Sequence, residues 1–78
     1  MIKQYTISAL TANAPGVLHR LASVLTQRRV NIESLNVKET ETKGVSRFSI
    51  VVFVEESAIE QIVSRMRRVV EVFEVSAG

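Results

Sequence analysis

The sequence predicts an α+β domain in which four strands form one antiparallel sheet and two helices cover one of its faces. Three observations predict it. Four segments are rich in β-branched residues, and the first of them nearly alternates apolar with polar positions, as a half-buried strand does. Two others repeat apolar residues at the spacing of an amphipathic helix. The order is strand, helix, strand, strand, helix, strand, which right-handed crossovers fold into a ferredoxin-like βαββαβ domain.

The first strand and the first helix are separated by a short loop. The strand is Ile2–Leu10, whose apolar face carries Tyr5, Ile7 and Ala9. Thr11–Ala14 is the predicted loop. Pro15 suits the first turn of the helix, because its missing N–H would be unpaired there. The helix is expected to end near Arg29, and its apolar stripe consists of Leu18, Leu21, Ala22 and Leu25, flanked by Val17 and Val24.

The two middle strands form a predicted hairpin. Ile32–Glu39 is the first of them, and the polar segment Glu39–Gly44 ends in the glycine typical of a hairpin loop. Val45–Val54 has apolar residues on both faces of its second half, which predicts a central strand. The second strand then lies at an edge of the sheet. That edge and the uncovered sheet face are natural surfaces for association.

The second helix has the sequence of a capping box at its start. Ser57 is the expected N-cap residue, and Glu60 is placed to reach back to it. The helix is expected to continue to about Arg68, with an apolar stripe of Ile59, Ile62, Val63 and Met66. Val69 or Val70 begins the closing strand, which is predicted to end at Val75.

Size and composition limit the chain to one domain, spanning residues 1–78. Its hydrophobic content of 46% is high for this length, and the only aromatic side chains are Tyr5, Phe48, Phe53 and Phe73. A domain this small and apolar often completes its burial by association, so we expect an oligomer. Cysteine is absent, as are a signal-peptide pattern and a long apolar run, which favours a cytoplasmic protein without a membrane partner.

Nucleic-acid binding is a possibility raised by the charge distribution. Residues 1–54 carry a net charge of +4 and residues 55–78 carry −2. However, most of the arginines fall late in helical segments, where cations favour the helix C-terminus. Phe48 and Phe53 resemble the aromatic pair of an RNA recognition motif, but Arg47 and Ile50 break that pattern. We expect no nucleic-acid partner, and an RNA-binding module remains the weaker alternative.

The residues needed for catalysis are missing. His19 is the only histidine, no Asp could orient it, and no second His or Cys could share a metal ion with it. The pairs Glu39/Glu41 and Glu55/Glu56 lie in or beside loops, where solvation explains them better than acid–base chemistry. There is no Gly-rich phosphate loop. We therefore expect no catalytic residues, no metal and no cofactor.

The start of the first helix is instead the candidate site, for a small zwitterion. The backbone N–H groups of Gly16, Val17 and Leu18 lack intrahelical partners, and the helix dipole favours a carboxylate there without any Lys or Arg. The amides of Asn13 and Asn31 can bind an ammonium group or a carboxylate. An aliphatic pocket would be lined by Val17, Leu18 and Ile32. These residues predict a free amino acid with an apolar side chain; alternatively, Asn13 is a helix cap and Asn31 a strand start.

Four motifs carry a family resemblance. They are Asn13-x-x-Gly16-x-Leu18, Asn31-Ile32-Glu33-Ser34-Leu35-Asn36-Val37, Ser46-Arg47, and Val70-Glu71-Val72-Phe73-Glu74-Val75. In this order and spacing they resemble the ACT domain of the small regulatory subunit of acetohydroxyacid synthase (acetolactate synthase). The resemblance covers essentially residues 2–76, and the stretch that begins at Asn31 is its most specific part.

The resemblance implies a non-catalytic regulatory subunit of branched-chain amino-acid biosynthesis. It implies that two ACT domains pair and that valine binds between the helix start of one chain and the second-strand start of the other. The residues implicated are Asn13, Gly16, Val17, Leu18, Asn31 and Ile32, and those of one protomer need not meet. The subunit would activate a separate thiamine-diphosphate-dependent catalytic subunit and confer feedback inhibition.

Two further expectations follow from the resemblance. An ACT sensor of another metabolic pathway remains an alternative function. Many subunits of this family carry a second domain of similar length, so the chain resembles either a short isoform or an excised domain.

Overall fold

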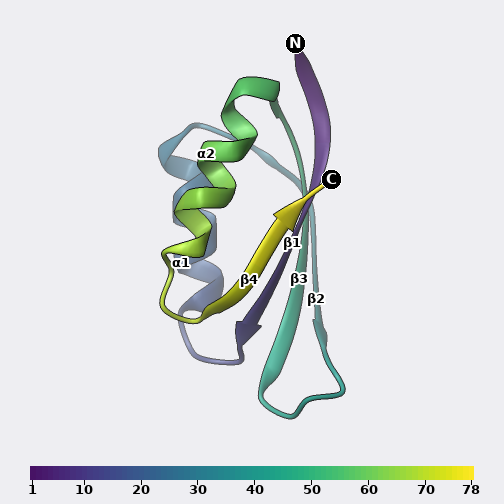
Figure 1. Ribbon diagram of the computed structural model, residues 1–78, viewed down its shortest axis with the longest axis vertical. Coiled ribbons are helices and arrows are strands. Elements are labelled where there is room, and N and C mark those ends of the chain that lie inside the picture. Colours follow the sequence, from purple (N-terminus) through teal and green to yellow (C-terminus); the bar gives the residue numbers. More distant parts are fainter.

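The computed structural model describes residues 1–78, and it confirms the predicted order of elements. The elements are β1 (Ile2–Ala12), α1 (Val17–Gln27), β2 (Ile32–Glu39), β3 (Val45–Glu55), α2 (Glu56–Arg67) and β4 (Val72–Ala77). The sheet order is β2-β3-β1-β4, and every neighbouring pair is antiparallel. Both helices lie on the same side of the sheet (Figure 1). The ferredoxin-like fold, the edge position of β2 and the interior position of β3 are therefore confirmed.

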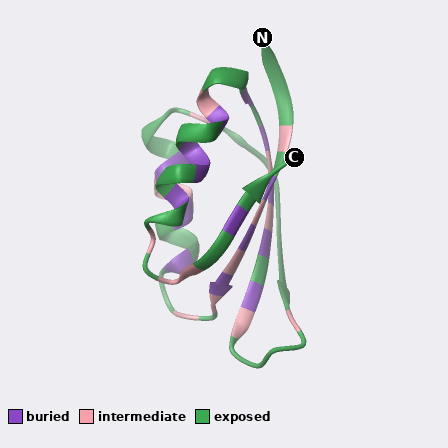
Figure 2. Cartoon of the chain, in the orientation of Figure 1, coloured by how far each residue is buried: buried purple, intermediate pink, exposed green.

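A single hydrophobic core lies between the helices and the sheet. Its 15 members are aliphatic apart from Phe48 and Met66. They alternate along β1, as the sequence predicts, and they also alternate along β3. The buried positions of the two helices and of the central strands are visible in Figure 2. Leu21, Leu25 and Ile62 are completely buried. The sheet thus has one face covered by helices and one open face.

The edge strand β2 is exposed along its whole length. Leu35 pairs with Ile50 and Val37 with Phe48, so these side chains of β2 point to the helix side of the sheet. The helices nevertheless leave Leu35 40% exposed and Val37 47% exposed. An unpaired strand edge with uncovered apolar side chains is therefore present on this side of the molecule.

The start of α1 differs from the prediction. Pro15 does not belong to the first helical turn, because the helix begins at Val17 and Gly16 precedes it in the left-handed conformation, with φ 84°. Glycine adopts that conformation without steric cost, so the chain turns sharply between β1 and α1. The buried stripe is also rotated relative to the expected one: Val17 and Val24 are buried, whereas Leu18 is 43% exposed.

The predicted capping box at the start of α2 is wrong. The helix begins at Glu56, directly after β3, and its N-cap residue is Glu55, which makes no side-chain cap hydrogen bond. The Glu56 N–H instead donates to the Met1 carbonyl at 3.1 Å. The pairing of β1 with β3 brings Met1 to this place, so the first turn of the helix is satisfied by tertiary structure rather than by Ser57 and Glu60.

The predicted closing strand is shifted by two to three residues. The Val69 N–H donates to Met66 and the Val72 N–H to Val69, so the chain forms a tight turn before β4 begins at Val72. The strand extends beyond Val75 to Ala77 and pairs with β1. The first and last strands of the chain are thus neighbours in the sheet.

The two phenylalanines of β3 lie in different environments. Phe48 is 3% exposed and belongs to the core, while Phe53 is 50% exposed. Stacking on RNA bases requires aromatic rings that are exposed on one sheet face. Phe48 is therefore not available to stack on a base, which weakens the RNA-binding alternative.

Candidate functional site

The candidate site centres on the turn between β1 and α1, residues Asn13–Gly16. The Asn13 N–H donates to the Gly44 carbonyl at 2.8 Å, and the Ala14 N–H donates to the Ala12 carbonyl at 3.0 Å. The turn is therefore anchored both to the hairpin loop before β3 and to the end of its own strand. Gly16 then reverses the chain into the helix.

Three backbone N–H groups at the start of α1 have no acceptor in the chain. They belong to Gly16, Leu18 and His19, whereas the Val17 N–H donates weakly to the Ala14 carbonyl at 3.4 Å. The prediction that Gly16 and Leu18 would be free is confirmed, and Val17 was wrongly included. No acidic side chain lies in the first turn. This end of the helix can therefore accept an anion from outside the chain.

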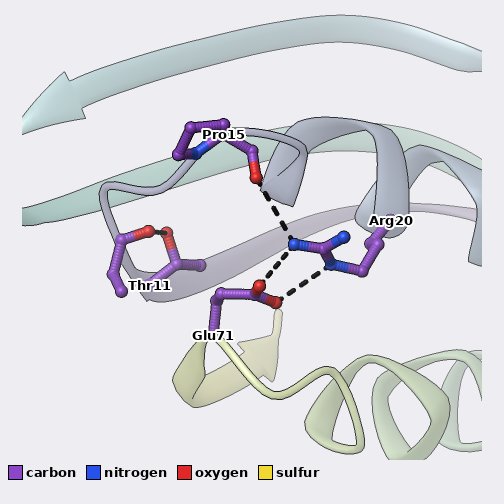
Figure 3. A network of polar contacts seen from close by, with 5 residues as sticks. Thr11, Pro15, Arg20 and Glu71 are labelled. Carbon is purple, nitrogen blue, oxygen red and sulfur yellow. Dashed lines mark hydrogen bonds and ion pairs between the residues drawn. The ribbon is translucent and has the colours of Figure 1, made fainter.

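A cation that the sequence did not reveal lies next to the turn. The Arg20 Nε donates to the Glu71 carboxylate at 3.0 Å, and its Nη2 donates to the other oxygen of that carboxylate (Figure 3). The same Nη2 donates to the Pro15 carbonyl at 3.4 Å. Arg20 therefore places a charged group beside the turn, although its guanidinium is already paired with Glu71. Arg20 and Glu71 are far apart in the sequence, and only the packing of α1 against the segment before β4 brings them together.

The ion pair changes the titration of Glu71. The hydrogen bonds from Arg20, followed by a backbone hydrogen bond, hold the pKa of this carboxyl below its ordinary value of 4.5. The ionised form is therefore the one that the folded state stabilises.

A pH-dependent loss of stability follows from this shift. A depressed folded-state pKa contributes stability above the unfolded pKa, and that contribution disappears as the pH falls through the folded pKa. We expect Glu71→Gln to be less stable than the parent chain at pH 7. The difference should narrow as the pH falls below 4.5. Urea unfolding at a series of pH values checks this, and a difference that stays constant down to pH 2 would contradict it.

The residues predicted to form one site lie in two separate places in the chain. Asn13 lies beside Gly44 and Val45, at one end of β3, whereas Ile32 pairs with Val52. Seven positions of β3 separate the two places, which corresponds to about 23 Å along a strand. Gly16, Val17 and Leu18 are at the Asn13 end. Asn31 and Ile32 are at the other end, so a single copy does not bring the six residues together.

A cavity lies beside Asn31, at the start of β2. Asn31 lines a cavity of about 390 Å³, together with apolar side chains that include Ile2, Phe53 and Ile62. Ile32, the next residue, is 37% exposed. Asn31 therefore stands at the rim of a partly apolar hollow at the start of the edge strand.

Two broader features of the chain bear on its chemistry. No group of three or more His, Cys, Asp or Glu side chains is assembled for a metal ion. No helix combines the length and the apolar character needed to cross a membrane.

The fold and its glycine turn define the class: this is a ferredoxin-like domain of the ACT type. A solved ACT domain from the GTP pyrophosphokinase of Chlorobium tepidum superposes with a TM-score of 0.82 over all of both chains, at 16% identity. At that identity the similarity concerns the fold alone. Residues 7–74 match the family described as the AHAS small subunit-like ACT domain, where AHAS is acetohydroxyacid synthase. The chain belongs to this family.

Two relatives show how much of a longer protein the chain represents. It is 42% identical over 71 residues to the acetolactate synthase small subunit of Mycolicibacterium smegmatis, covering 91% of this chain and 42% of that protein. The crystal structure of the acetolactate synthase small subunit from Thermotoga maritima superposes with a TM-score of 0.85 at 37% identity. The superposed region covers 96% of this chain and 47% of the Thermotoga maritima chain. The chain thus spans less than half the length of these relatives.

Proposed function

We propose that the chain is a regulatory ACT domain of acetolactate synthase, in which two copies bind valine or a related amino acid between them. Its family membership and the names of its relatives support the assignment to this enzyme. The chain would activate a thiamine-diphosphate-dependent catalytic subunit in the cytoplasm and make it sensitive to feedback by branched-chain amino acids.

The observation that carries the proposal is the uncovered edge of β2. Antiparallel pairing of two β2 strands about a twofold axis would extend the sheet across two copies. Leu35 and Val37, which the helices leave exposed, would then be covered. Leu18 is exposed on α1 and adds apolar surface to the helix layer. A small, apolar domain gains burial from such a contact.

The same pairing would complete the ligand site. In an antiparallel pair, the start of one β2 lies beside the end of the other. Asn31 of one copy would thereby approach the turn Asn13–Gly16 of its partner, although the two lie at opposite ends of one copy. Within one chain, the separation of about 23 Å between Asn31 and the turn prevents them from binding one ligand. In the dimer, the same separation would place Asn31 of one copy beside the turn of the other.

Each part of a zwitterion has a partner in this arrangement. The carboxylate would accept hydrogen bonds from the Gly16 and Leu18 N–H groups, assisted by the helix dipole. The ammonium group would donate to the side-chain carbonyls of Asn13 and Asn31. The aliphatic side chain would lie against the apolar surface, which consists of Val17, Leu18 and Ile32.

Reconstitution with a catalytic subunit tests the function. We expect the chain to raise the rate of acetolactate formation several-fold, and added valine to reduce that stimulation. The measurement is acetolactate production by a catalytic subunit of the family, with and without the chain, across a valine titration. Calorimetry with valine, leucine and isoleucine runs in parallel. Binding without stimulation would favour the sensor of another pathway, and neither binding nor stimulation would overturn the proposal.

A further inference from the structure

One ion pair connects three segments that meet at the start of α1. Arg20 belongs to the helix, Pro15 to the turn, and Glu71 to the segment between α2 and β4 (Figure 3). The Glu71 carbonyl in addition accepts a hydrogen bond from the Ala12 N–H at 2.8 Å. Glu71 therefore holds the end of β1 through its backbone and the beginning of α1 through its side chain.

The guanidinium of Arg20 lies directly against the backbone of the turn. A Cβ atom added to Gly16 would be 3.3 Å from Arg20 Nη1, which is closer than ordinary van der Waals contact. The Arg20 N–H donates to the Gly16 carbonyl at 3.0 Å. Arg20 thus contacts the turn twice: its backbone N–H donates to Gly16, and its guanidinium donates to Pro15.

The pairing is more rigid than an ordinary surface contact. Both carboxylate oxygens of Glu71 accept from Arg20, and a bidentate pair fixes orientation as well as distance. The side chain of Glu71 is 19% exposed, while that of Arg20 is 47% exposed. By contrast, both side chains of the Lys3–Glu56 pair are 49% exposed and are joined by one contact at 2.9 Å. The Glu71 carboxylate is therefore less exposed to water than either member of the Lys3–Glu56 pair.

We propose that Arg20 and Glu71 form a clamp that holds the turn Asn13–Gly16 in the conformation that binds the ligand. This inference rests on the proposed function. The two residues act as positioning residues, because they fix the backbone from which the Gly16 and Leu18 N–H groups emerge. A turn that is ordered before the ligand arrives avoids the entropy cost of ordering on binding.

Neutral variants of the clamp test it. Glu71→Gln and Arg20→Gln are each expected to weaken valine binding about tenfold in calorimetry of the dimer. The double variant should bind no more weakly than either single variant, since either change opens the same clamp. Arg20→Lys should restore only part of the affinity, because an ammonium group cannot reproduce the planar, bidentate contact.

A matched control separates the clamp from the general loss of an ion pair. Lys3→Gln breaks the Lys3–Glu56 pair, which lies at the opposite end of the sheet, and it should leave valine affinity unchanged. Amide hydrogen exchange provides a readout that overall stability does not set. The Asn13 and Val17 N–H groups should exchange faster in the clamp variants, while the amides of β3 remain as protected as in the parent chain.

The outcomes distinguish the clamp from the proposed function. Clamp variants that bind valine like the parent chain would overturn the clamp and leave the function intact. Additive losses in the double variant would also overturn it, because they would mean two separate roles. If the parent chain binds no branched-chain amino acid, the proposed function fails. Unchanged exchange at Asn13 and Val17 in Arg20→Gln would then overturn the clamp independently.

Discussion

Replacing Gly16 by aspartate is expected to abolish valine binding, with a loss of affinity of about 100-fold or more. The new carboxylate would stand beside the free amides of α1, where the carboxylate of the ligand is proposed to bind, and would repel it. The substitution also strains the backbone, because Gly16 has a φ of 84°. Its Cβ would crowd Arg20 at 3.3 Å. Calorimetric titration with valine provides the measurement.

Gly44→Asp is the matched control for this variant. Gly44 has nearly the same backbone conformation, with φ 82°, and a Cβ there would meet no atom within 4 Å. The change therefore introduces the same charge and a similar strain in the hairpin loop. The Gly44 carbonyl, which accepts from the Asn13 N–H, is retained, and the new Cβ would touch neither the turn nor the start of α1. We expect Gly44→Asp to keep most of the affinity. Equal losses in both variants would attribute the effect to strain, and normal binding by Gly16→Asp would place the ligand elsewhere.

Val37→Lys is expected to convert the dimer into a monomer and to remove valine binding at the same time. A twofold β2 contact would bury two unpaired ammonium groups, one from each copy, and lysine on an edge strand is a natural barrier to strand pairing. We expect the dimer dissociation constant to rise about 100-fold or more. Sedimentation velocity over a range of concentrations measures the oligomeric state.

Val70→Lys makes the same chemical change at a different surface. Val70 is 91% exposed in the segment between α2 and β4, far from the β2 edge in the sheet order. This variant should remain dimeric and should still bind valine. A Val37→Lys chain that stays dimeric would place the interface elsewhere. A monomeric Val37→Lys chain that binds valine would show that one copy contains the whole site.

Most of the fold could be predicted because its signals are local. Alternation in β1, the apolar run of β3 and the helical stripes mark the segments that contribute to the core, and the order of elements limits the topology. The start of α2 could not be predicted in this way. Ser57 and Glu60 have the spacing of a capping box, but the acceptor for the helix start is Met1, at the far end of the sequence. A backbone carbonyl that is distant in the sequence thus takes the place of the expected Ser57 side-chain cap.

The site shows the same division between local and distant information. The free amides at Gly16 and Leu18 follow from the geometry of any helix start, and the structure confirms them. The ion pair of Arg20 with Glu71 joins residues 51 positions apart, and no local pattern marks either residue as a partner. Whether Asn13 and Asn31 bind one ligand stays a prediction, because it concerns two copies of the chain.

The pairing of the first strand with the last has a consequence for how the chain folds. β1 lies between β3 and β4, and β4 supplies Val75 to the core. The core therefore cannot close until β4 is available, and the pairings of β1 with β3 and with β4 join residues that are far apart in the sequence. High contact order of this kind slows folding relative to helical proteins of the same size. During synthesis, one edge of β1 stays exposed until β4 has left the ribosome.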